Sequence, residues 1–212
     1  MNLVPLLSWC DMPKGSKTTT KVRLLNAAIS EFAAHGFKGA SLRDIAKGAD
    51  ANVAAVKYHY KSKDDLWREV VSHLYRALGE AVMQDKRREQ MGSVQEAIRH
   101  STRQYILFSA KNPELYRITL FEMIEGGERL DWLARNQLRE FMERSMAWSS
   151  IAQQGGVFDK KVPPLNLVYV MMGAIQTLFM MAPQIERSFG IDVFVEEQVD
   201  AHVDAIMRLF DL

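Results

Sequence analysis

Residues 41–63, SLRDIAKGADANVAAVKYHYKSK, constrain the fold of this chain more than any other stretch. Ser41 with an acidic residue three positions later is typical of a helix start, and Gly48 predicts the end of that helix. Asn52 predicts the cap of a second short helix. The stretch therefore predicts two short helices joined by a tight turn, followed by a basic and aromatic exit into a longer helix.

Glycine and proline divide the rest of the chain into segments of helical length. Apolar residues recur at helical spacing in these segments, and no convincing strand pattern is present. We therefore expect an all-α fold with about nine helices. Besides the two short helices, the predicted segments are 20–35, 64–88, 93–110, 113–125, 129–154, one that begins at 163–164 and is kinked or ended by Pro183, and one from 190–192 to the C-terminus. The predicted domains are a flexible tail at 1–16, a helix-turn-helix domain at 17–64 and a larger domain at 65–212.

The composition is that of an ordinary soluble globular protein, with 48% hydrophobic and 25% charged residues. Cys10 is the single cysteine, so no internal disulfide can form and the reducing cytoplasm is the expected location. The most apolar run, Leu165–Pro183, is interrupted by Asn166, Gly173 and Gln176. It predicts a buried helix and no membrane span.

Basic residues gather near the amino end. Residues 14–63 hold ten Lys and Arg against three acidic residues, a net charge of +7, whereas the rest of the chain carries a net −6. A basic segment on an acidic body is the electrostatic footprint of a protein that binds a polyanion, and a solvated basic face is the alternative. Since the second short helix is small and polar enough to lie in a major groove, double-stranded DNA is the expected partner.

The basic segment resembles the DNA-binding half of the tetracycline-repressor (TetR) family of bacterial regulators. The resemblance covers roughly residues 20–70 and lies in FAAHGF at 32–37, SLRDIA at 41–46, NVAAV at 52–56 and YHYKSK at 58–63. It implies a transcriptional repressor that binds a palindromic operator as a homodimer and is released by a small-molecule effector.

The resemblance also implies which residues contact DNA, and the residue types agree with it. The fork of Arg43 matches the two acceptors of a guanine edge, and Lys63 at a helix N-terminus suits a phosphate. Tyr58 and His59 resemble the phosphate-clamping aromatic pair of the family. The complete predicted set is Arg43, Asn52, Val53, Ala54, Ala55, Lys57, Tyr58, His59 and Lys63.

Two positions depart from the family pattern. Asp50 stands in the turn where the family usually has glycine, and we expect it in the left-handed conformation that aspartate tolerates better than most residues. Lys57 replaces a residue that is often tyrosine or asparagine in the family, so the resemblance does not indicate which bases this chain reads.

The resemblance implies a homodimer through the last two helices. The apolar stripes on these helices fit a partner, and packing against the core of the same protomer is the alternative that periodicity leaves open. The predicted interface residues are Leu167, Val170, Met171, Ala174, Leu178, Val203, Ile206 and Phe210.

An effector pocket in the larger domain is also implied. Twelve methionines, several of them clustered near residues 171–181, suit an adaptable apolar cavity and a hydrophobic or amphipathic effector. The predicted pocket residues are Arg103, Tyr105, Phe108, Tyr116, Phe121, Trp132, Trp148 and Gln176.

Alternatives to a ligand-released repressor are a DNA-binding regulator controlled by a protein partner, an activator, and a small helical enzyme. The chain has no HExxH, CxxC, Walker, GxSxG or GxGxxG motif, and its five histidines are scattered. Glu122 and Glu125, one helical turn apart, could bind a metal, but surface pairing is the expected arrangement. We therefore expect no enzyme activity, no catalytic residue, no metal and no cofactor.

Overall fold

The computed structural model describes residues 19–82 and 91–212, and its contacts divide the chain into unit 1, up to Val70, and unit 2, from Val71 onward. The described residues form helices and no strand, which confirms the predicted all-α fold. The predicted tail at 1–16 lies outside the described residues, and so does the end of the helix predicted over 64–88.

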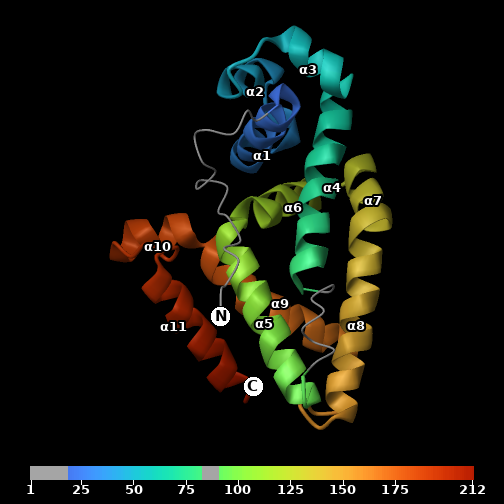
Figure 1. Ribbon diagram of the computed structural model, residues 1–212, viewed down its shortest axis with the longest axis vertical. Helices are drawn as coiled ribbons and strands as arrows, with labels where there is room; N and C mark the ends of the chain where they lie inside the picture. Colours follow the sequence, from blue (N-terminus) through green and yellow to red (C-terminus); the bar gives the residue numbers. More distant parts are fainter. Residues whose placement is uncertain (1–18, 83–90) are drawn as a thin grey trace. The chain divides into compact units, whose positions relative to one another are not determined.

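Unit 1 is built around the first helix of the chain. Its elements, blue to green in Figure 1, are α1 (Thr20–Gly39), α2 (Leu42–Gly48), α3 (Val53–Tyr60) and the first part of α4 (Lys63–Val82). Helix α1 packs against both α2 and α3. Leu24, Phe32 and Ile45 are buried in this core, together with Trp67 from α4. This small core holds α2 and α3 in place.

Gly36 interrupts α1 close to the predicted end at residue 35. Its φ of 64° and ψ of −179° lie outside the helical region, and a positive φ favours glycine because a Cβ would clash there. The backbone N–H of Ala40 still donates to the Gly36 carbonyl at 3.2 Å. The chain thus turns between residues 36 and 40 before α2 begins.

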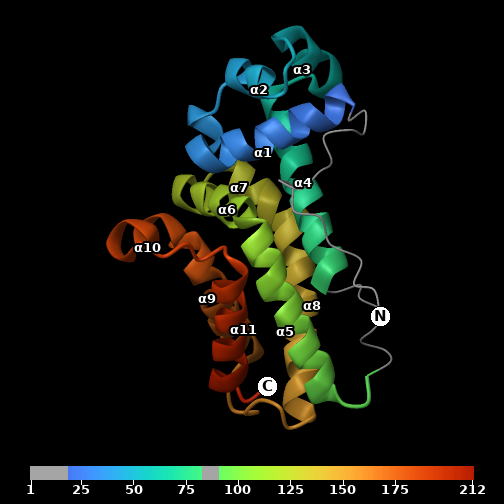
Figure 2. The ribbon, with the colours of Figure 1, turned by 60° about the vertical axis from the view of Figure 1, so that its left-hand side comes forward.

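Unit 2 takes the rest of α4 and all later helices. These are α5 (Val94–Lys111), α6 (Pro113–Glu125), α7 (Glu128–Leu133), the π-helical turn η3 (Ala134–Leu138), α8 (Arg139–Gln154), α9 (Pro164–Met180), α10 (Ala182–Phe189) and α11 (Glu196–Leu209). Helix α5 packs against α8, α9 and α11, and Figure 2 shows it beside α9 and α11. Its central residue Ile106 is completely buried, as is Phe179 of α9.

The predicted start of the last helix at 190–192 is wrong, because α11 begins at Glu196. The Asp192 carboxylate accepts a hydrogen bond from the Phe194 backbone N–H at 2.9 Å, so the aspartate closes a turn instead of capping a helix. Val193 is buried at this turn.

The apolar run at 165–183 forms α9 and the start of α10. Among the described residues no single helix is long and apolar enough to cross a membrane; α9 and α10 reach that length and apolar content only as a pair, bent by 53°. Leu167, Val168, Ile175 and Phe179 of α9 are buried in unit 2.

Candidate nucleic-acid interface and ligand cavity

Side-chain caps fix both ends of the turn between α2 and α3. The Ser41 hydroxyl accepts from the backbone N–H groups of Arg43 at 3.1 Å and Asp44 at 3.4 Å. The Asn52 side-chain oxygen accepts from the Ala55 N–H at 2.8 Å. Both predicted caps are therefore present, and each satisfies N–H groups that a helix start leaves open.

Asp50 occupies the turn with a φ of 49°, in the left-handed region that we expected for it. The Asp50 N–H donates to the Lys47 carbonyl at 3.1 Å, and the Ala51 N–H donates to the Ala46 carbonyl at 2.9 Å. These bonds close the end of α2 through the left-handed residue.

Two long-range hydrogen bonds tie this turn and α3 to α1. The Arg23 guanidinium donates to the Ala49 carbonyl at 2.9 Å, and the Tyr60 hydroxyl donates to the Lys21 carbonyl at 2.8 Å. Burial, with a smaller contribution from the charge of Glu69, raises the pKa of Tyr60 to about 12, so this hydroxyl remains a donor at neutral pH. Helix α3 is held firmly on its inner side as a result.

The outer side of α3 carries the predicted DNA contacts. Val56 and Tyr60 face the core, whereas Ala54, Lys57 and Tyr58 are exposed. Tyr58 is 83% exposed, and its ring meets His59 edge to face with 5.0 Å between ring centres. An exposed large aromatic beside a lysine is typical of a surface that meets a partner.

The remaining predicted DNA residues surround this face. Arg43 and Asn52 are exposed, whereas Val53, Ala55, His59 and Lys63 are partly buried. The Lys63 ammonium lies 4.7 Å from the centre of the Phe37 ring, a distance that suits a cation–π contact.

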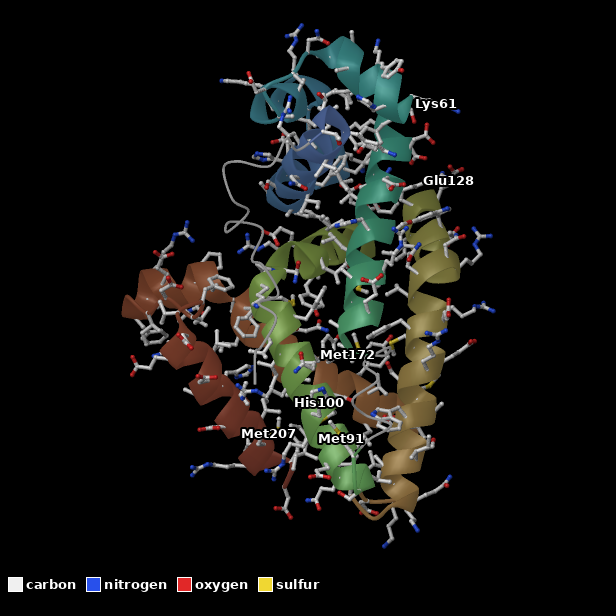
Figure 3. The ribbon with its side chains drawn as sticks, viewed as in Figure 1. Lys61, Met91, His100, Glu128, Met172 and Met207 are labelled. Carbon is white, nitrogen blue, oxygen red and sulfur yellow. The ribbon has the colours of Figure 1, made fainter. Side chains whose placement is uncertain are left out.

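Sequence reasoning missed two further exposed lysines, Lys47 in the last turn of α2 and Lys61 after α3. Lys61, labelled in Figure 3, has a φ of 47° at the point where the chain turns into α4. Both belong to the basic cluster at 14–63, and that cluster was the signal that could have found them.

Glu122 and Glu125, weighed above as a metal pair, are both bound by one arginine. Arg129 Nε lies 2.9 Å from the Glu122 carboxylate, and Arg129 Nη2 lies 2.9 Å from the Glu125 carboxylate. The described residues contain no group of three metal-ligating side chains. The two glutamates therefore join α6 to α7 through ion pairs, but Glu122 is buried, so its pairing is not at the surface as expected.

Unit 2 contains a cavity of about 90 Å³ between α5, α8 and α9, near the end of α4. Two of the predicted pocket residues, Tyr105 and Trp148, line it. Met172, labelled in Figure 3, is part of its wall, and so is Met171, which was predicted for the dimer interface. The full wall is Val82, Ile98, Ser101, Thr102, Tyr105, Phe141, Ser145, Trp148, Ser149, Phe158, Val168, Met171, Met172 and Ile175.

The other six predicted pocket residues are not among the residues that line this cavity. Arg103 points to α11, where its guanidinium lies 3.5 Å from the Asp200 carboxylate. Gln176 is buried and donates to the Tyr105 hydroxyl, so it supports the wall from behind. Phe108, Tyr116, Phe121 and Trp132 pack elsewhere in unit 2. The predicted pocket residues were mostly chosen because they are aromatic. Which face of a helix lines the cavity depends on how the helices pack, and aromatic character alone does not show that.

Three cavity residues on α5 were also missed: Ile98, Ser101 and Thr102. Ile98, Ser101, Thr102 and Tyr105 all line the cavity and follow the i, i+3, i+4, i+7 spacing of one helix face. That spacing was the signal available in the sequence. Ser101 and Thr102 are small and polar, so this helix face did not stand out as an apolar stripe in the sequence.

A second, more polar hollow of about 320 Å³ lies between α4 and the η3–α8 segment. It shares Phe141 with the apolar cavity and contains Arg76, Glu140 and Arg144. Arg144 is paired with Glu140 at 2.7 Å. The two hollows thus differ in charge as well as in size.

The stripes predicted for the dimer interface face largely inward. Leu167, Val203 and Ile206 are buried within the protomer, and Met171, Ala174, Leu178 and Phe210 are partly buried. Of the predicted set, Val170 alone is exposed. The exposed apolar face of α9 consists of Leu165, Tyr169 and Val170, together with Met181 directly after the helix, and Val170 is its one residue from the predicted set. Periodicity found the apolar faces but could not tell which of them the protomer itself covers.

Comparison with known proteins gives matches within unit 1 and matches over about nine tenths of the chain. A sequence model described as "Bacterial regulatory proteins, tetR family" matches residues 24–70. The "probable HTH-type transcriptional regulator YttP" of Bacillus subtilis is 42% identical over 59 residues, which are 28% of each chain. The HTH-type transcriptional repressor SCO4008 of Streptomyces coelicolor is 28% identical over 195 residues, which are 91% of this chain and 95% of that protein.

Solved structures share the fold over about nine tenths of the chain. AibR in complex with isovaleryl coenzyme A and operator DNA has a TM-score of 0.72 and 17% identity, over 91% of this chain and 98% of that one. The TetR family transcriptional regulator PfmR from Thermus thermophilus has a TM-score of 0.66 and 20% identity, over 90% of this chain and 97% of that one. At these identities the likeness concerns the fold.

Proposed function

We propose that this chain, which belongs to the TetR family of bacterial regulatory proteins, is a transcriptional repressor that leaves its DNA operator when a small molecule binds unit 2. The single observation that carries the proposal is the outer side of α3, where Lys57 and Tyr58 are exposed beyond a helix locked to α1. The match of repressor SCO4008 along 91% of the chain supports the repressor role. The role is regulatory and not catalytic, and its place is the bacterial cytoplasm.

In this proposal α3 lies in the major groove of the operator. Arg43 reads a base edge, while Val53 and Ala54 let the backbone approach and offer apolar contact to a thymine methyl. Tyr58, His59 and the lysines bind phosphates, which position the helix without reading sequence.

A single unit 1 makes too few contacts with DNA for tight sequence specificity, so two copies of the chain must bind the operator together. We assign the copies to a homodimer formed through the exposed apolar face of α9 and the last helix. A twofold protein requires a palindromic operator, with half-sites about 34–36 Å or a multiple apart.

Release of the operator follows from a shift of the equilibrium between two conformations of the protein. The effector binds one conformation of unit 2 better than the other and moves the equilibrium only by that difference in affinity. Helix α4 connects the two sites, since Lys63 begins it at the DNA-binding unit and Val82 ends it at the cavity wall. AibR, with isovaleryl coenzyme A and operator DNA in one crystal structure, is a precedent in the same fold for both kinds of partner.

The test is selection of bound fragments from genomic DNA with the purified full chain. We expect one enriched motif with twofold symmetry, and we expect a matched Arg43→Ala, Lys57→Ala double variant to lose it. Enrichment of no motif, or of one without twofold symmetry, would contradict the proposal. Transcription from a template carrying the recovered site then separates repression from activation.

A further inference from the structure

Among the residues that the structure describes, the wall of the unit 2 cavity carries no side chain that is charged at neutral pH. It is built from aliphatic, aromatic, methionine, serine and threonine side chains, and burial raises the pKa of its one ionisable residue, Tyr105. A charged group placed against these side chains would be partly desolvated and would gain no ion pair from them. The described wall therefore offers a counter-charge to neither an anion nor a cation.

Ser101 is a buried hydroxyl on this wall that lacks a hydrogen-bond partner. It is 6% exposed, and its Oγ meets no donor or acceptor in the described part of the chain. Two other serine hydroxyls on the wall already donate hydrogen bonds to backbone carbonyls. Ser145 donates to the Phe141 carbonyl at 2.8 Å and Ser149 donates to the Ser145 carbonyl at 2.9 Å. A buried polar group left without a partner is costly, so Ser101 is a position where a ligand can supply the missing bond.

The aromatic side chains of the remaining wall favour a flat ring. Tyr105, Phe141, Trp148 and Phe158 present aromatic surfaces, which pack against another ring edge to face or offset. The volume of about 90 Å³ is smaller than the cavity of about 150 Å³ known to accept benzene in another protein. Met171 and Met172 are flexible enough to turn aside and admit one ring.

We propose that this cavity binds an uncharged aromatic compound of about one ring, whose single polar group forms a hydrogen bond with Ser101 Oγ. The inference rests on the proposed effector response and names the chemistry of the effector. Entry of the ring displaces the methionines of α9, so that occupancy changes how α9 packs against α5 and α8. A carboxylate or phosphate group has no place in this cavity.

The test compares four small probes with the full chain in the absence of DNA. Calorimetry gives the affinities of phenol, toluene, benzoate and benzylammonium. We expect phenol to bind with a Kd in the millimolar range or tighter, and benzoate and benzylammonium to bind at least about tenfold more weakly because the wall offers them no counter-charge. No binding of phenol, or benzoate binding as tightly as phenol, would overturn the proposal.

Ser101→Ala tests the hydrogen bond. We expect the variant to bind phenol about tenfold more weakly and toluene unchanged, since a hydrogen bond to a neutral partner is worth about one order of magnitude. The ligand-free variant should melt no lower than the wild type, because the substitution removes a buried hydroxyl that had no partner. Ser150→Ala is the matched control, since Ser150 lies on α8 outside the cavity and its hydroxyl donates to the Met146 carbonyl at 3.0 Å.

A lower melting temperature for Ser101→Ala, or an equal loss of phenol and toluene affinity, would assign Ser101 a structural role and refute the hydrogen bond. Operator binding is measured separately on the same preparations. Intact phenol binding without any operator binding would refute the proposed function alone, and intact operator binding without phenol binding would refute this inference alone.

Discussion

Lys63 combines two roles at the first position of α4. Its ammonium lies over the Phe37 ring at 4.7 Å, and it stands at a helix N-terminus, where open backbone N–H groups attract a phosphate. The ring contact restricts the side chain before DNA arrives, so less side-chain entropy is lost when a phosphate binds.

We expect Lys63→Gln to weaken binding to operator and to unrelated DNA by similar factors, because a phosphate contact carries no sequence information. The plot of log Kd against log salt should become less steep by about 0.9 for each phosphate that the variant no longer neutralises. Lys160→Gln, a change of the same charge in an exposed loop of unit 2, is the control. An unchanged slope for Lys63→Gln would show that this lysine does not meet a phosphate.

Sequence patterns predicted residues well where the reason for the residue was local. Ser41 and Asn52 cap helices because their side chains reach N–H groups two or three positions ahead, and the structure confirms both. The cavity wall could not be predicted in the same way. Phe108 and Phe141 are both buried aromatics, yet Phe141 alone lines the cavity, because the choice depends on neighbours distant in sequence.

At the scale of elements, the turn between α2 and α3 depends on one strained residue. A non-glycine residue at a φ of 49° brings its Cβ close to the following carbonyl oxygen, at a cost of about 1 kcal/mol that aspartate partly avoids. Glycine removes this strain but loses more conformational entropy on folding.

We expect Asp50→Gly to raise the free energy of unfolding of unit 1, or leave it unchanged, and Asp50→Ala to lower it by about 0.5–1 kcal/mol, since alanine keeps the Cβ without the local hydrogen bonding of aspartate. Urea denaturation followed by tryptophan fluorescence measures both in a chain whose Trp9, Trp132 and Trp148 are replaced by phenylalanine, because Trp67, which is fully buried in unit 1, is then the single tryptophan. Equal destabilisation by the two substitutions would mean that the Asp50 side chain, and not its backbone conformation, holds the turn.

Some helix boundaries were predicted correctly and others were not, and the difference depends on the residues that stand at the helix ends. Glycine and proline stand directly at the ends of α5 and α6, at the start of α7, at the end of α8 and at the start of α9, as predicted. No such residue marks the π-helical turn η3, which divides the single helix predicted over 129–154 into α7 and α8. The start of α11 was placed too early because Asp192 looks like a cap but closes a turn. An aspartate caps a helix or a turn by the same hydrogen bond to a nearby N–H, so sequence alone does not separate the two.

At the scale of the whole molecule, the exposed face of α9 bears on assembly. Tyr169 and Val170 are 55% and 57% exposed on a helix whose other side is buried in unit 2. Adjacent apolar side chains of this size on a surface favour a protein partner, and a second copy of the chain is the partner that a palindromic operator requires.

We expect light scattering to give a dimer of 24.2 kDa chains for the wild type and a monomer for Tyr169→Asp at micromolar concentration, because a charge in a buried apolar interface has no counter-ion. Ile151→Asp, a like substitution of an exposed apolar residue on α8, should remain dimeric. A monomeric wild type would remove the basis for a twofold operator, and a dimeric Tyr169→Asp would place the interface elsewhere.

The most direct measurement of the central claim, that unit 1 reads DNA sequence, is the affinity of the whole protein for its recovered operator and for a scrambled duplex at one salt concentration. We expect Arg43→Ala to cost about 1–3 kcal/mol on the operator and clearly less on the scrambled duplex. Arg135→Ala, which removes an exposed arginine of unit 2, should change neither affinity. Equal losses on both duplexes, or no loss on either, would contradict base reading by the α2–α3 segment.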